Sequence, residues 1–349
     1  MPHWTMIAEI GSGVVVVAAV LADIFATILV PGPVGGRLRV ILAVRSLSLP
    51  LWRIAARRRH DGDLRPSNGF APVTLLLTFG TWMLLLLVGF GLLVHAAGPL
   101  FRPQVQTWSD AVWVTGSSLM TLGVSEFDAQ GLARWLILAS ALSGFSALTA
   151  CVTFMLQIQA GLHQREPAVM TLVGLAGSPP SGVHILESFA DLGDRDQLGR
   201  FFLDWRNWAA STLHSHLSYP VLSYYRSLDA QNDWLAALEA VLDAATLVMA
   251  ATDDKACGAA TLMHRTGSRT AKQLRELFVA CVLDAPADGE RAEQAVRRLR
   301  ARGYGGEDEG HAAARFLALR ADYAHDLEAL ALHLGANRAT LLGRDGAAD

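Results

Sequence analysis

The sequence predicts an all-α membrane protein with three transmembrane helices, a re-entrant loop, and an all-helical soluble domain after them. The chain has 349 residues, of which 52% are apolar, but the apolar residues are unevenly distributed. Residues 1–160 contain three long apolar blocks and no lysine, whereas the remainder is rich in Asp, Glu and Arg. In that remainder, apolar residues recur at helical spacing. This change of pattern indicates a membrane part followed by a part in water.

Three stretches have the roughly 20 mostly apolar residues that a membrane-spanning helix needs. They are Ile10–Val30, Ala71–Ala97 and Leu132–Gln157. The first is not expected to be a cleaved signal peptide, because residues 1–9 contain no Lys or Arg and no small-residue cleavage site follows. Residues 1–31 are therefore predicted to form an N-terminal transmembrane helix.

Residues 32–69 are predicted to form a basic cytoplasmic linker at the membrane interface. Within it, the apolar stretch Val40–Ala55 is too short to cross and is interrupted by charges, which is typical of a helix lying in the interface. Because basic loops remain in the cytoplasm, we expect the N-terminus outside and the chain after residue 160 inside, in a cell membrane. The loop's arginines are Arg37, Arg39, Arg45, Arg53, Arg57, Arg58, Arg59 and Arg65.

Two interpretations of these arginines remain open. They either set the topology alone or also bind anionic lipid, at about 1 kcal/mol for each well-placed side chain. The residues proposed for lipid binding are Arg37, Arg39, Arg57, Arg58 and Arg59.

The outward connection between the second and third spans contains a short apolar segment. Residues 110–120 can form about three helical turns, which is too short to cross a bilayer. They are also too apolar for an ordinary surface loop, and non-helical backbone at membrane depth survives only where protein or a water-filled path buries it. A short helix followed by the run 121–125 therefore predicts a re-entrant element.

This element resembles the pore helix and selectivity filter of the potassium-channel superfamily. Trp113 lies in the segment that matches the aromatic-bearing pore helix, and Thr121-Leu122-Gly123 matches the Thr-Val-Gly of the filter. Glu126 stands where the family usually has Asp, and Gly144 where its inner helix carries a hinge glycine.

The resemblance implies that residues 70–160 are a pore domain and that the protein is a homotetramer. Four loops would offer backbone oxygens, along Thr121 to Val124, to a dehydrating monovalent cation such as K⁺. The cation is the permeant species, so no cofactor and no bound structural metal are expected.

The filter departs from the family at two positions. Val124 replaces the family's aromatic residue, and Ser125 replaces its second glycine, where a non-glycine residue costs about 1–3 kcal/mol of backbone strain. We therefore expect an altered filter with reduced K⁺ selectivity. The alternative is a non-conducting, channel-like scaffold or signalling protein that acts through its cytoplasmic domain.

Three further residues each have more than one interpretation. Gly144 is either a hinge or a site of close packing, since glycine inside a helix costs up to about 1 kcal/mol. Asp23, a carboxylate inside the first span, either couples to an arginine of the basic loop or makes a structural bond to a Ser or Thr of a neighbouring helix. Glu126 either concentrates cations or braces the filter at the pore mouth, or is an ordinary solvated acid.

Residues 161–349 are predicted to form an all-helical cytoplasmic domain, with no strand–helix alternation and no phosphate-binding glycine pattern. His214 and His216 are two residues apart and point to different helix faces, so they make a poor metal pair. Cysteines 151, 257 and 281 are too scattered for a metal cluster. No catalytic constellation and no strongly basic face are evident, so we expect neither an enzyme nor a nucleic-acid partner. The predicted helices are Gln197–Leu217, Leu228–Met249, Ser268–Leu283 and Gly310–His333.

Overall fold

The computed structural model is almost entirely helical, which confirms the all-α prediction. The chain forms two compact units, and the division between them falls between Ile158 and Gln159. The structure describes residues 3–28, 40, 43–44, 46–48, 70–123, 126–227, 233–252, 257–279, 288–305 and 308–343. Outside these residues lie Val124 and Ser125, and the linker arginines Arg37, Arg39, Arg45, Arg53, Arg57, Arg58, Arg59 and Arg65.

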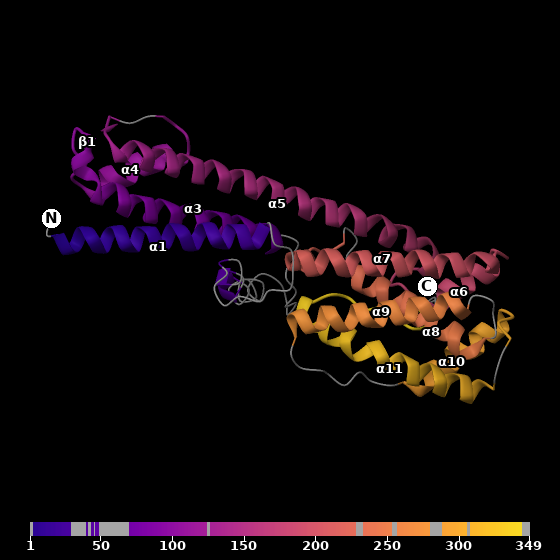
Figure 1. Cartoon of the computed structure of the whole chain (residues 1–349). Helices are drawn as coiled ribbons and strands as arrows, with labels where there is room; N and C mark the ends of the chain where they lie inside the picture. Colours follow the sequence, from indigo (N-terminus) through magenta and orange to yellow (C-terminus); the bar gives the residue numbers. More distant parts are fainter. Residues whose placement is uncertain are drawn as a thin grey trace, which may run out of the picture. The chain divides into compact units, whose positions relative to one another are not determined.

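In the first unit, α1 (His3–Ile28) and α3 (Phe70–Ala96) lie side by side (Figure 1). Two glycines allow the helices to approach closely, because a Cβ atom on Gly13 would lie 2.8 Å from the Gly89 carbonyl oxygen. Small residues at helix crossings are typical of membrane proteins, where van der Waals packing drives association.

The chain after α3 forms a loop that is closed at its base. It runs through η1 (Gly98–Leu100), β1 (Phe101–Arg102), α4 (Trp108–Leu119) and β2 (Asp128–Ala129). β1 pairs antiparallel with β2, with Phe101 opposite Ala129. The loop therefore leaves and returns at the same level, with α4 inside it.

Helix α5 (Leu132–Ala176) continues well beyond Gln157, where the sequence predicted the third span to end. Polar residues from Gln157 onward mark a change of surroundings, but they keep good helix propensity and do not stop the helix. Pro167 is accommodated within it. The division between the two units therefore falls inside a single helix.

The second unit is a helical bundle around α8 (Trp234–Ala251), which contacts α6 (Gly182–Asp191), α9 (Cys257–Phe278) and α11 (Glu309–Leu334). All four predicted helices are found here, although α9 begins well before Ser268. The remaining elements are η2 (Arg195–Gln197), α7 (Leu198–Ser218), η3 (Pro220–Tyr224) and α10 (Gly289–Ala301).

Among the described residues, four helices are long and apolar enough to span a membrane by length and composition: α1, α3, α5 and α8. The first three agree with the predicted spans. Helix α8 differs, because 94% of its most apolar window is buried inside the unit. Its apolar surface is therefore the core of the bundle.

Candidate functional site

Helix α4 begins at a well-formed cap. The Thr107 side chain accepts a hydrogen bond from the backbone N–H of Asp110 (3.2 Å), and the Asp110 carboxylate accepts one from the backbone N–H of Thr107 (3.2 Å). This reciprocal capping satisfies two backbone donors that would otherwise lack partners. Ala111 and Val114 then pack into a small core with Val94 and Phe101. The cap and this core fix α4 beside the end of α3.

Helix α4 ends in a tight turn that begins the filter-like sequence. The N–H of Leu122 donates to the Ser117 carbonyl (2.8 Å), and the N–H of Thr121 to the Ser118 carbonyl (3.0 Å). This is the Schellman pattern, which normally places glycine in the left-handed conformation that Thr121 adopts here (φ 54°). A β-branched residue in that conformation stores about 1–3 kcal/mol of strain.

The turn residues lie at the surface of the first unit. Thr121, Leu122 and Gly123 are exposed, and 61% of Leu122 is accessible. Gly123 has a φ of 68°, and no described atom lies within 4 Å of the position a Cβ atom would take. Glu126 is exposed beyond the turn. A large apolar side chain at a helix end is thus left without cover in the single chain.

Trp113 faces an apolar groove of about 570 Å³ between α3 and α4 and remains 53% exposed. The α3 wall of the groove is formed by Gly80, Met83, Leu84 and Leu87. The predicted pore-helix aromatic therefore lies at the surface of the protomer.

Gly144 brings α5 against the end of α4. A Cβ atom at this position would lie 2.0 Å from the carbonyl oxygen of Leu119 and 2.8 Å from its carbonyl carbon. The adjacent residue of α4 also contacts α5, because the Ser118 hydroxyl donates to the Ile137 carbonyl (2.8 Å). Helix α5 is unbroken at Gly144. This geometry favours close packing of the two helices, and a hinge at Gly144 stays a prediction.

Asp23 is buried, and its bonds connect α1 to α3. The Trp82 indole N–H donates to Oδ2 at 2.6 Å, and the backbone N–H of Val40 lies 3.3 Å from both carboxylate oxygens. Trp82 and the Val40 backbone bond Asp23 where a Ser or Thr was expected. The arginines of the alternative interpretation lie outside the described residues. Trp82 went unrecognised because its apolar ring is typical of any buried span, although its N–H requires a partner when buried.

A second polar contact connects the other ends of the same two helices. His95 Nδ1 lies 3.1 Å from a Glu9 carboxylate oxygen, and its ring packs edge-on against Trp108 at the start of α4. Sequence reasoning did not find this contact between His95 and Glu9. The signal was an acid near the start of one span and a histidine near the end of the next, which antiparallel packing brings together.

In the second unit, Arg165 is the centre of a buried polar cluster. Its guanidinium donates to Glu166 (2.6 Å) and to the carbonyls of Leu222 and Tyr225, and one nitrogen lies 3.2 Å from His216 Nε2. Burial and the nearby Arg165 charge lower the pKa of His216 to about 3, so this histidine is neutral. The cluster joins α5 to the end of α7.

His214 is exposed whereas His216 is buried, so the two do not converge, as their spacing indicates. Within the described ranges, no group of three or more His, Cys, Asp or Glu side chains could hold a metal ion. The aromatic residues of α7 contribute to the core, since Phe202, Trp205 and Trp208 are buried.

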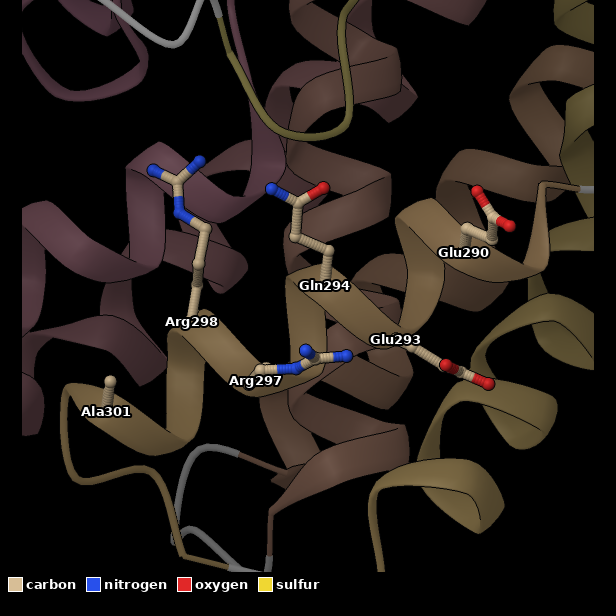
Figure 2. Close-up of a pocket in the computed structure, with 6 residues that line it drawn as sticks. All are labelled: Glu290, Glu293, Gln294, Arg297, Arg298 and Ala301. Atoms are coloured by element: carbon tan, nitrogen blue, oxygen red, sulfur yellow. The ribbon is translucent and has the colours of Figure 1, made fainter.

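A hollow of about 590 Å³ lies on the surface of α10. Figure 2 labels the side chains that line it. Its two arginines pair with acids outside the hollow: Arg298 pairs with Glu187 (2.6 Å), and Arg297 lies 3.7 Å from Glu309. We assign no chemistry to this hollow. Its lining residues are Glu290, Glu293, Gln294, Arg297, Arg298 and Ala301.

The candidate functional site is therefore the segment from α4 to Glu126 together with the part of α5 that packs on it. No protein-family model, curated protein or solved structure matches this chain.

Proposed function

We propose that residues 70–160 build the pore of a homotetrameric channel for monovalent cations. The observation that carries the proposal is the position of α4. This helix of 12 residues is too short to span a bilayer, yet it is capped and held between two helices that are long enough. The paired strands β1 and β2 return the chain to the level at which it left. Irregular backbone at membrane depth must be buried in protein or line a water-filled path.

Four copies around an axis would supply that path. The exposed Leu122 and the groove beside Trp113 are apolar surfaces that neighbouring subunits would cover. The turn backbone at Thr121, Leu122 and Gly123 would offer carbonyl oxygens to the ion. The C-terminal ends of the four α4 helices would direct partial negative charge toward the axis, which favours cations.

In this arrangement the N-terminus is outside and the second unit is cytoplasmic. Exposed tryptophans support one membrane interface at the outer level, because Trp4, Trp108 and Trp135 lie at or near the starts of α1, α4 and α5. Tryptophan is enriched at the boundary between lipid and water. Weak K⁺ selectivity is part of the proposal, since Val124 and Ser125 replace the residues that shape the outer filter in the family that this segment resembles.

The proposal is tested by cation flux into liposomes that contain the purified protein. Two glycines form a matched pair for this assay. Gly123 (φ 68°) and Gly131 (φ 56°) both have left-handed backbone, and no described atom lies within 4 Å of either Cβ position. Replacing either with Ala introduces a similar backbone strain, but only Gly123 lies on the proposed ion path.

We expect cation flux from the wild-type protein, loss of flux in Gly123→Ala, and near wild-type flux in Gly131→Ala. Equal flux from the two variants, at equal amounts of folded protein, would contradict a pathway along the α4 turn. Bi-ionic reversal potentials test selectivity, and a strict preference for K⁺ over Na⁺ would rule out the altered-filter part of the proposal.

The second candidate is a non-conducting membrane scaffold that acts through its helical second unit. The left-handed turn at Thr121 favours it, because the hydrogen bonds of that turn hold the filter-like segment in a local structure. Single-channel recording distinguishes the two candidates. Well-folded tetramers that carry no cation current would favour the scaffold.

A further inference from the structure

One side of α9 in the second unit carries a row of exposed cations. Leu262, Arg265, Arg269 and Lys272 are exposed and recur every three or four residues, so they lie along one side of the helix. Glu276, the next exposed residue along this row, lies 3.6 Å from Arg275. Among the residues that the structure describes, no carboxylate pairs with Arg265, Arg269 or Lys272.

The absence of acidic partners in the described part of the chain distinguishes this row from the arginines of α10. On α10 and at its C-cap, Arg291, Arg297 and Arg302 are also exposed. Each of them has an acidic partner, respectively Asp288, Glu309 and Asp191. Charge on α10 is thus compensated within the unit. Charge on the α9 row is not compensated by any acid that the structure describes, so it can attract a partner outside the unit.

Helix α7 extends the same surface. It runs parallel to α9, because a Cβ atom on Gly199 would lie 3.9 Å from that of Ala259, and Thr270 Oγ1 donates to the Ala209 carbonyl at 3.4 Å. Leu203 is exposed, Arg206 is half-buried, and they lie four and seven residues after Gly199, on the side of α7 that meets α9. The register places them, next to exposed Asp204, at the level where the α9 row begins. We call the surface the α7–α9 face; it consists of Leu203, Arg206, Leu262, Arg265, Arg269 and Lys272.

We propose that the α7–α9 face docks on anionic lipid headgroups of the membrane that the same chain spans. Each Lys or Arg near an anionic leaflet strengthens binding about fivefold. The exposed leucines Leu203 and Leu262 can enter the headgroup region beside these charges, which is the composition of a membrane-surface helix.

Attachment to the membrane makes even a weak attraction effective. The second unit begins at Gln159, directly after the apolar part of α5, so it cannot diffuse away from the bilayer. Docking is then an intramolecular step with a high effective concentration of lipid. The inference rests on the proposed cytoplasmic placement of the second unit but not on ion conduction. Docking at this face would make the position of the unit sensitive to lipid composition and salt.

The test uses the full chain in nanodiscs of phosphatidylcholine alone or mixed with phosphatidylglycerol. A fluorescent donor is attached at Gly258→Cys, in a background whose native cysteines are replaced, and the acceptor is on the lipid headgroups. Gly258 is exposed at the start of the α9 row, and no described atom lies within 4 Å of its Cβ position. We expect higher energy transfer in the anionic nanodiscs and a decrease of that transfer as salt is added.

Two triple variants with equal loss of charge decide the assignment. Arg265→Gln/Arg269→Gln/Lys272→Gln is expected to lower the ratio of docked to undocked protein about fivefold per cation, on the order of a hundredfold in all. The control variant is Arg291→Gln/Arg297→Gln/Arg302→Gln. It is expected to keep the wild-type response of energy transfer to lipid composition and salt.

Equal transfer in the two lipids would overturn the lipid assignment and point to an acidic protein as the partner of this face. A full response in the α9 variant would overturn it as well. If that variant does not fold, the salt titration of the wild-type protein decides alone. Cation flux in liposomes of the same lipids is measured separately, so that failure of conduction and failure of docking are distinguished.

Discussion

Replacing Gly144 with Ala tests the contact that holds α4 against α5. The added Cβ atom would lie 2.0 Å from the Leu119 carbonyl oxygen. Since close C–H···O contacts in proteins have C···O distances of about 3.3 Å, the helices must separate by roughly 1.3 Å. No rotamer can relieve this clash, because both sides are backbone. Overpacking of this kind costs about 1–3 kcal/mol, and the better helix propensity of Ala returns at most about 1 kcal/mol.

We therefore expect Gly144→Ala to displace the α4 turn and to lower the free energy of unfolding by about 1–3 kcal/mol relative to Gly11→Ala, which gains the same helix propensity. The measurement is thermal unfolding of the purified protein in detergent, together with cation flux. Gly11→Ala is the matched control, because Gly11 lies in α1 with no described atom within 4 Å of its Cβ position. An unchanged midpoint in Gly144→Ala would refute the packing argument. A normal midpoint with a lower open probability would instead support the hinge.

Three other substitutions test separate parts of the structure. Trp82→Phe removes the indole donor to buried Asp23 and is expected to lower the free energy of unfolding by about 1–3 kcal/mol, measured by thermal unfolding. An unchanged free energy of unfolding would show that the bond is dispensable. Arg338→Gln leaves buried Glu239 with one fewer cation and should lower the free energy of unfolding by denaturant by about 2–3 kcal/mol. This is at or below the lower end for breaking a buried pair, because Arg338 is partly exposed. An unchanged denaturation midpoint would contradict this expectation. His216 has a folded pKa of about 3 against 6.5 in the unfolded chain, so the unfolded state binds more protons and stability falls as pH drops from 6.5 toward 3. His216→Gln should remove this part of the pH dependence, and identical pH–stability profiles of the variant and the wild-type protein would contradict the burial argument.

The three helices that are long and apolar enough to span a membrane were predictable, because hydropathy over about 20 residues depends on composition alone. The ends of these helices were less predictable. The third span was expected to stop at Gln157, where polar residues begin, but those residues report the end of apolar surroundings and not the end of the helix. The apolar helix α8 shows the converse limit, since its composition is compatible with a span while the second unit buries it.

Within the candidate site, sequence reasoning identified the unusual residues but not their contacts. Gly144 was recognised as costly inside a helix, yet only the fold reveals the Leu119 carbonyl opposite it. Asp23 was recognised as costly inside a span, but its partner Trp82 could not be identified without knowing which faces of α1 and α3 meet. The left-handed backbone of Thr121 was not predictable, because threonine rarely adopts it.

The unpaired cations of α9 were also missed. Acids are interspersed with basic residues throughout residues 161–349, so the sequence shows no strongly basic face. Pairing depends on tertiary neighbours: Arg275 finds Asp326 at 2.7 Å, whereas Arg265 and Arg269 find no acid among the described residues.

An electron-microscopy reconstruction of the purified protein in K⁺ tests the central claim most directly. We predict four-fold symmetry, with the turns that contain Thr121 and Gly123 facing one another at the axis and cation density between them. A monomeric or dimeric particle, or α4 helices at the periphery with no axial passage, would contradict the proposed pore.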